Sequence, residues 1–98
     1  RSVDLIDMIN AESIAIPELE SGYYVINHVF ARSVNADKWA QKMREQGYSP
    51  RQFIRSSNNY HYVYLDFDTD PDVLYKRLTT FRTNKDLKKA WMLKINLD

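Results

Sequence analysis

The sequence predicts an α+β fold in which four strands form one antiparallel sheet with two helices on one of its faces. The chain has 98 residues, 44% of them hydrophobic, which suits a single small domain. A strand-forming run followed by a helical pattern occurs twice, at Gly22–Phe30 and again from residue 60. Each half closes with a further extended segment, so the predicted element order is βαββαβ.

The first half begins with a strand and continues into a helix. Aromatic and β-branched residues dominate Gly22–Phe30, which favours a strand. Asn35 is a suitable N-cap for a helix over residues 36–46, and Gly47 is a typical residue just past a helix end. The apolar stripe of this helix, which we expect to lie in the core, consists of Ala36, Trp39, Ala40 and Met43.

The second half repeats this arrangement. Residues 48–55 are predicted to form a strand at the sheet edge, because Pro50 cannot donate a backbone hydrogen bond. Residues 60–67 alternate cleanly and predict the third strand. A helix is expected over residues 71–82 and a last strand over residues 90–97.

Two βαβ-type crossovers in one antiparallel sheet give the ferredoxin-like arrangement, with the first and third strands in the centre. Both helices then cover one face, and we expect the other face to have no covering element. An exposed aromatic face usually binds something. We expect this face to carry Tyr24, Ile26, His28, Tyr62, Tyr64, Met92 and Lys94. Trp91 fits either the core or the binding face.

Residues 1–21 are interpreted as a linker or N-terminal extension, and residues 22–97 as the domain. Val3, Leu5, Ile6, Met8 and Ile9 have loose helical spacing, and residues 14–17 suggest an extended segment before Pro17. The chain begins at Arg1. We therefore expect it to be an excised or processed piece, with membrane attachment only through a segment upstream.

Composition argues against several classes of function. The net charge of +1 gives no strong attraction to nucleic acid. The absence of cysteine excludes disulfides, thiolate metal sites and cysteine nucleophiles. We find no paired acid–base or nucleophile arrangement and no metal-binding motif around His28 or His61, so we expect neither an enzyme nor a cofactor.

Acidic residues alternate along residues 66–72 in a pattern that superficially resembles a calcium-binding loop. Pro71 stands where an EF-hand needs glycine, and Arg77 stands where it needs an acid. We therefore interpret the acids as a strand end followed by a helix cap.

Several segments resemble the SPOR domain, the sporulation-related repeat of bacterial envelope proteins. The similar segments are Tyr23-Tyr24-Val25-Ile26 with Phe30, Asn35-Ala36, Gly47-Tyr48, Tyr62-Val63-Tyr64-Leu65 with Phe67, and Ala90-Trp91-Met92-Leu93. Together they span about residues 21–95. The sequence departs from the family pattern at His28, where the family has glycine, and in the shortened end of the third strand.

The resemblance implies non-catalytic binding of peptidoglycan glycan strands that lack stem peptides, in the bacterial periplasm. It places the ligand on the sheet face opposite the helices, at Tyr24, Ile26, His28, Tyr62, Tyr64, Trp91 and Met92. His28 could instead be a structural histidine. Two alternatives remain: single-stranded RNA binding on the same face, and a protein-interaction module of an envelope secretion or motility assembly, with other envelope proteins as partners. The RNA alternative is disfavoured by the low net charge and the missing RNA-binding motif in the third strand.

Overall fold

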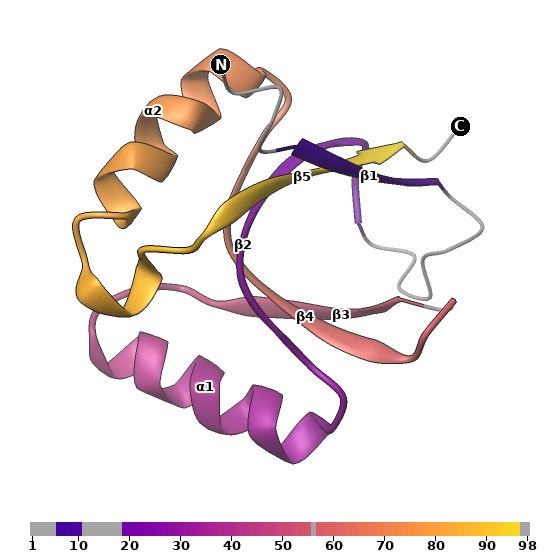
Figure 1. Ribbon diagram of the computed structural model, residues 1–98, viewed down its shortest axis with the longest axis vertical. Helices are drawn as coiled ribbons and strands as arrows, with labels where there is room; N and C mark the ends of the chain where they lie inside the picture. Colours follow the sequence, from indigo (N-terminus) through magenta and orange to yellow (C-terminus); the bar gives the residue numbers. More distant parts are fainter. Residues whose placement is uncertain (1–5, 11–18, 56, 97–98) are drawn as a thin grey trace.

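A computed structural model describes residues 6–10, 19–55 and 57–96 of the chain. Within these ranges, five strands form one sheet, joined by two α-helices and a short 3-10 helix (Figure 1). Four of the strands are antiparallel neighbours and follow the order βαββαβ with the two helices. The predicted ferredoxin-like α+β class is confirmed.

The first strand–helix unit is close to the prediction. Strand β2 (Gly22–Phe30) has the predicted bounds. Helix α1 (Ser33–Glu45) begins at Ser33 rather than at residue 36, and its N-cap is Arg32, which makes no capping hydrogen bond through its side chain. The predicted N-cap role of Asn35 is therefore wrong.

The apolar stripe of α1 is only partly in the core. Ala36, Ala40 and Met43 are buried as predicted. Trp39 is half-buried and packs at the outer edge of the helix against the rings of His28 and Phe30. We expected Trp39 in the core, and this is wrong. Its ring faces the end of β2 rather than the middle of the sheet.

The hairpin of the second half also follows the sequence. Strand β3 (Arg51–Arg55) starts directly after Pro50, which lacks a backbone N–H for the ladder. Strand β4 (Tyr60–Asp68) pairs with it in antiparallel register, with Phe53 opposite Tyr62.

The last elements begin at well-formed caps. Helix α2 (Pro71–Phe81) has Asp70 as N-cap, and this carboxylate accepts hydrogen bonds from the backbone N–H groups of Asp72 (2.9 Å) and Val73 (3.4 Å). The 3-10 helix η3 (Lys85–Leu87) and strand β5 (Trp91–Asn96) complete the chain as described.

The strand order is β1-β5-β2-β4-β3, which places β3 at an edge as predicted from Pro50. The additional strand β1 (Ile6–Asn10) pairs in parallel with β5, from Ile6 opposite Met92 to Asn10 opposite Asn96. The helical interpretation of this segment is wrong, because it pairs with the outer edge of β5. The predicted extended segment at residues 14–17, and Val3 and Leu5, lie outside the described residues.

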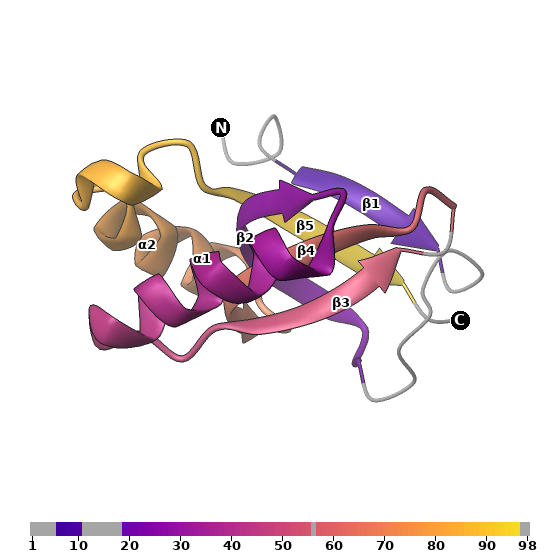
Figure 2. The same cartoon turned by 90° about the horizontal axis from the view of Figure 1, so that it is seen from below.

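Both helices pack on one face of the sheet, as Figures 1 and 2 show from two directions. The buried residues between α2 and the sheet are Val25, Leu74, Leu78, Ala90 and Met92. We call this side the helix-side face and the opposite side the helix-free face. No helix in the described ranges is long and apolar enough to cross a membrane.

Two irregularities in the β2–β4 ladder determine which side chains reach each face. Tyr64 lies opposite Ile26 and Asp66 opposite Val25, so Leu65 has no opposite residue. On β2, Asn27 likewise has no opposite residue, because the next pair after Ile26 is formed by His28. Each β-bulge reverses the alternation of its strand from that point onward.

Gly22 is a position where the fold requires glycine. Its φ is +153°, and a Cβ atom there would lie 2.6 Å from Cε1 of Phe67 and 3.2 Å from the carbonyl oxygen of Asp68. Gly47 has a φ of +95° but no neighbouring atom within 4 Å of such a Cβ.

We predict that Gly22→Ala lowers the free energy of unfolding by about 2–4 kcal/mol, through steric overlap added to backbone strain. The control Gly47→Ala, with backbone strain alone, should cost about 1–2 kcal/mol. Urea denaturation of both variants measures the difference. Equal costs would contradict the close approach of Phe67 to Gly22.

Candidate functional site

The helix-free face is packed, not open. Tyr24 is 2% exposed and Tyr62 is 7% exposed. Leu19, which precedes the first long strand, packs on the same face. The expectation of an uncovered face is therefore wrong. The buried cluster on this face consists of Leu19, Tyr24, Ile26, Phe53, Tyr62, Leu93 and Ile95.

Aromatic ring contacts connect three strands across this face. The ring of Tyr24 meets Tyr64 edge-on at 5.0 Å between centroids and Phe67 at 4.8 Å. Phe53 stacks on Tyr62 at 5.0 Å with an interplanar angle of 16°. These distances and angles are the ones at which aromatic pairs attract beyond their area burial. The rings therefore contribute to the core.

The two buried tyrosines have hydrogen-bond partners within the chain. The hydroxyl of Tyr24 donates to the carbonyl oxygen of Glu20 (2.6 Å) and accepts from the N–H of Glu20 (2.9 Å). Burial raises the pKa of Tyr24 to about 12. The hydroxyl of Tyr62 accepts a hydrogen bond from Nη1 of Arg55 at 3.0 Å. These bonds hold Glu20 and Arg55 against the cluster.

Two of the predicted site residues lie on the other face. Met92 is fully buried on the helix-side face, because Trp91 lies opposite Ile26 in the ladder and the two therefore share the helix-free face. His28 follows the bulge at Asn27, so its ring stacks on Phe30 at 4.4 Å and meets Trp39 at 5.0 Å on the helix side. The expected positions of Met92 and His28 are wrong.

Trp91, which the sequence left open, is half-buried and packs against the cluster on the helix-free face. Its indole nitrogen is buried without a hydrogen-bond partner. Lys94, also expected on the open face, lies over the ring of Tyr23 instead, at 5.7 Å from its centroid.

A groove remains accessible beside the cluster, near the β3–β4 edge. Aromatic rings and two leucines form part of its wall, and the polar part includes Arg51, Glu20 and Asp66. We call it the Tyr64 groove. Its volume is about 210 Å³, and its lining residues are Leu19, Glu20, Tyr24, Ser49, Arg51, Tyr64, Leu65, Asp66 and Phe67.

The sequence identified two of these residues, Tyr24 and Tyr64, and missed the others. Simple alternation from Tyr62 and Tyr64 would place Phe67 on the helix side, but the bulge at Leu65 turns it toward Tyr24. Arg51 gave no signal because it is one exposed charge at a strand start. Pairing Phe53 with Tyr62 across the predicted hairpin would have brought Arg51 opposite Tyr64.

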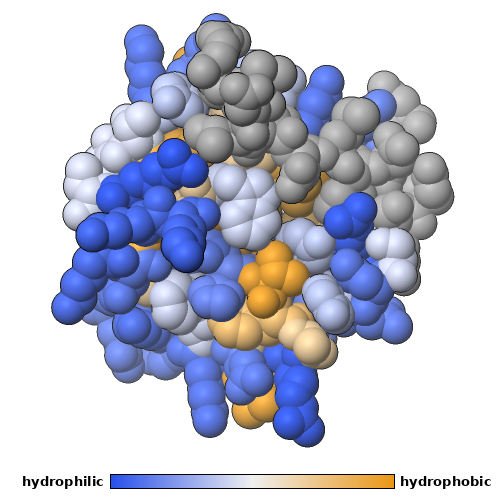
Figure 3. Space-filling model, viewed as in Figure 1, coloured by the Kyte–Doolittle hydropathy of each residue, from blue (hydrophilic) through white to orange (hydrophobic). Residues whose placement is uncertain are grey.

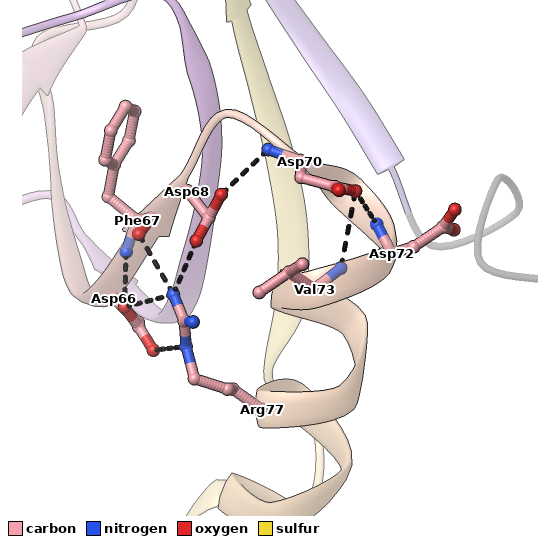
Figure 4. Close-up of polar contacts among 7 residues, drawn as sticks. All are labelled: Asp66, Phe67, Asp68, Asp70, Asp72, Val73 and Arg77. Carbon is pink, nitrogen blue, oxygen red and sulfur yellow. Dashed lines mark hydrogen bonds and ion pairs between the residues drawn. The ribbon is translucent and has the colours of Figure 1, made fainter.

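The acidic segment between β4 and α2 has a structural role (Figure 4). Arg77 from α2 donates to Asp66 at 2.7 and 3.2 Å and to Asp68 at 3.2 Å. The backbone N–H of Asp70, together with Arg77, holds the pKa of Asp68 below its usual value. With Asp70 capping the helix, these acids join α2 to the sheet. In the described part of the chain, no three acidic or histidine side chains are grouped to hold a metal ion.

The side of the molecule drawn in Figure 3 is mainly hydrophilic. Figure 3 shows one side of the molecule with hydrophilic residues around a small hydrophobic area. Among the described residues, the large hydrophobic side chains that are exposed are scattered over several elements: Val34, Ile54, Tyr60 and Val73. Isolated residues of this kind are usual in soluble domains and indicate no broad docking patch.

The buried hydroxyl of Tyr24 predicts a loss of stability in alkali. Because the folded-state pKa is raised from 10.0 to about 12, this group contributes stability that is fully present below pH 10 and is lost as the pH rises through 12. The free energy of unfolding should therefore fall between pH 10 and pH 12 in the parent chain. In Tyr24→Phe, which lacks the hydroxyl, this fall should be smaller by roughly 2 kcal/mol. Chemical denaturation at several pH values measures both. Identical slopes would contradict the burial of this hydroxyl.

No protein-family model matches the chain, and no curated protein or solved structure matches it either. The fold is therefore established from the structure itself. The resemblance to the SPOR family rests on short sequence segments and on the order of the elements.

Proposed function

We propose that the domain binds peptidoglycan glycan strands without catalysis and so localises a larger protein in the bacterial cell envelope. The observation that carries this proposal is the composition of the Tyr64 groove. Aromatic rings and charged or hydroxyl side chains line one accessible hollow on the helix-free face. The SPOR resemblance supports the same ligand and the same face.

The chemistry of the groove suits a sugar. The C–H face of a pyranose packs on aromatic rings, and Tyr64 and Phe67 supply rings that are only half-buried. Sugar hydroxyls and N-acetyl groups need donors and acceptors close to these rings. Arg51 is an exposed donor in the groove wall, and Glu20 is an exposed acceptor.

The structure narrows the candidate ligand contacts. Tyr24 and Tyr62 are buried and hydrogen-bonded within the chain, so their rings support the groove rather than meet the ligand. Asp66 lines the groove but is already bound by Arg77. We assign glycan contact to the accessible side chains of the groove wall, Tyr64, Phe67, Arg51 and Glu20.

The test is co-sedimentation of the purified chain with peptidoglycan sacculi, with and without prior amidase treatment to remove stem peptides. We predict binding that increases after amidase treatment. Tyr64→Ala and Arg51→Ala should each weaken it by about tenfold, the effect of losing one ring or one charged hydrogen bond.

Matched controls separate the groove from general effects. Tyr60→Ala removes a 45% exposed tyrosine of the same strand outside the groove, and Arg44→Ala removes an exposed arginine of α1. Both should bind like the parent chain. Absence of binding to either preparation of sacculi would refute the proposal, and salt-dependent binding to single-stranded RNA instead would favour the RNA alternative.

A further inference from the structure

A second hollow lies on the other side of the sheet, between the end of β2, helix α1 and the η3 segment. Its volume is about 300 Å³. It is separate from the Tyr64 groove and shares no residue with it. We call it the Asn27 cleft, and its lining residues are Asn27, His28, Trp39, Lys85, Asp86, Lys88 and Lys89.

The bulge in β2 places an unpaired amide in this cleft. Asn27 is the bulged residue and is only 8% exposed. Both its side-chain oxygen and its side-chain nitrogen are buried with no hydrogen-bond partner. Leaving such groups unpaired is unfavourable, so a buried amide of this kind requires an explanation.

Trp39 presents a further unpaired donor in the same wall. Its indole nitrogen is buried without a hydrogen-bond partner. The ring of His28, an exposed residue, lies edge-on against Trp39. Since neighbouring atoms cover the indole nitrogen and both polar atoms of Asn27, a ligand reaches them by displacing a side chain such as His28.

The charge of the cleft is positive. Three exposed lysines line it, Lys85, Lys88 and Lys89, and none of them forms a salt bridge to a described residue. Asp86, its one acidic residue, is bound by Lys42 at 3.5 Å and by Gln46 at 3.0 Å. The lysines are therefore available to an anion.

We propose that the Asn27 cleft binds a small acylamino carboxylate, a molecule that carries a secondary amide next to a carboxylate. The side chain of Asn27 binds the ligand amide through one hydrogen bond, either its oxygen accepting from the ligand N–H or its NH2 group donating to the ligand carbonyl. The indole N–H of Trp39 donates to a ligand oxygen, and the lysines bind the carboxylate. Asp86 disfavours a dianion such as phosphate.

This chemistry has two sources, an N-acylated amino acid and an N-acetylated sugar acid, and the cleft is large enough for either. The inference does not depend on the proposed function, because it concerns a different face of the sheet. Failure of the domain to bind sacculi would leave it intact.

The test is a titration of the ¹⁵N-labelled chain followed through the two tryptophan indole N–H signals, with Trp39→Phe used for assignment. N-Acetylalanine and N-acetylmuramic acid are the probes that carry both groups. We expect a saturable shift of the Trp39 signal with at least one of them and no shift of Trp91, which lies on the opposite face. The probe that binds more tightly shows whether the ligand is an N-acylated amino acid or an N-acetylated sugar acid.

Acetate and N-acetylglucosamine each carry one of the two groups and should bind at least tenfold more weakly. Lys88→Ala combined with Lys89→Ala should weaken binding at least fivefold, whereas Lys76→Ala with Arg44→Ala, which removes equal charge outside both hollows, should not. Equal shifts with acetate or inorganic phosphate, or no saturable shift with either main probe, would overturn the proposal. Asn27→Ala should also abolish the preference for the acylamino group.

Discussion

The pairing of β2 with β4 is the constraint on which the rest of the structure depends. These two strands are the centre of the sheet, and each contains one bulge, at Asn27 and at Leu65. Because the bulges lie on opposite strands, their effects on register cancel and the ladder continues to Phe30 opposite His61. Their effects on side-chain direction do not cancel, since each strand reverses its alternation.

This reversal shapes both the Tyr64 groove and the Asn27 cleft. On β4, it turns Phe67 toward Tyr24 and leaves Asp66 for Arg77, which completes the aromatic wall of the Tyr64 groove. On β2, it turns His28 toward Trp39 and buries the amide of Asn27. A regular ladder would have placed His28 beside Tyr24, as the sequence suggested. The residues expected on one aromatic face therefore lie on both sides of the sheet. The tyrosines form the packed cluster on the helix-free face, and His28 lies in the cleft on the helix-side face.

The sequence predicted the fold because its signals are local. Alternation, the caps at Asp70 and Pro71, and the edge position required by Pro50 each act within a few residues. The site was harder, because the face of a side chain depends on the partner strand. The pairing of Trp91 opposite Ile26 puts Trp91 on the helix-free face and Met92 on the helix-side face, and no local sequence pattern predicts a bulge at Asn27 or Leu65. The strand Ile6–Asn10 was missed because five residues also fit a helical turn.

Chemical nitration of tyrosine, read out by peptide mass spectrometry, tests the packed helix-free face most directly. Tyr60 is 45% exposed and should react first under native conditions. Tyr24 and Tyr62, at 2% and 7% exposure, should react only as the chain unfolds, and Tyr64 should fall between these limits. If Tyr24 and Tyr62 were nitrated as fast as Tyr60, the helix-free face would be open to solvent, which would contradict the packed cluster.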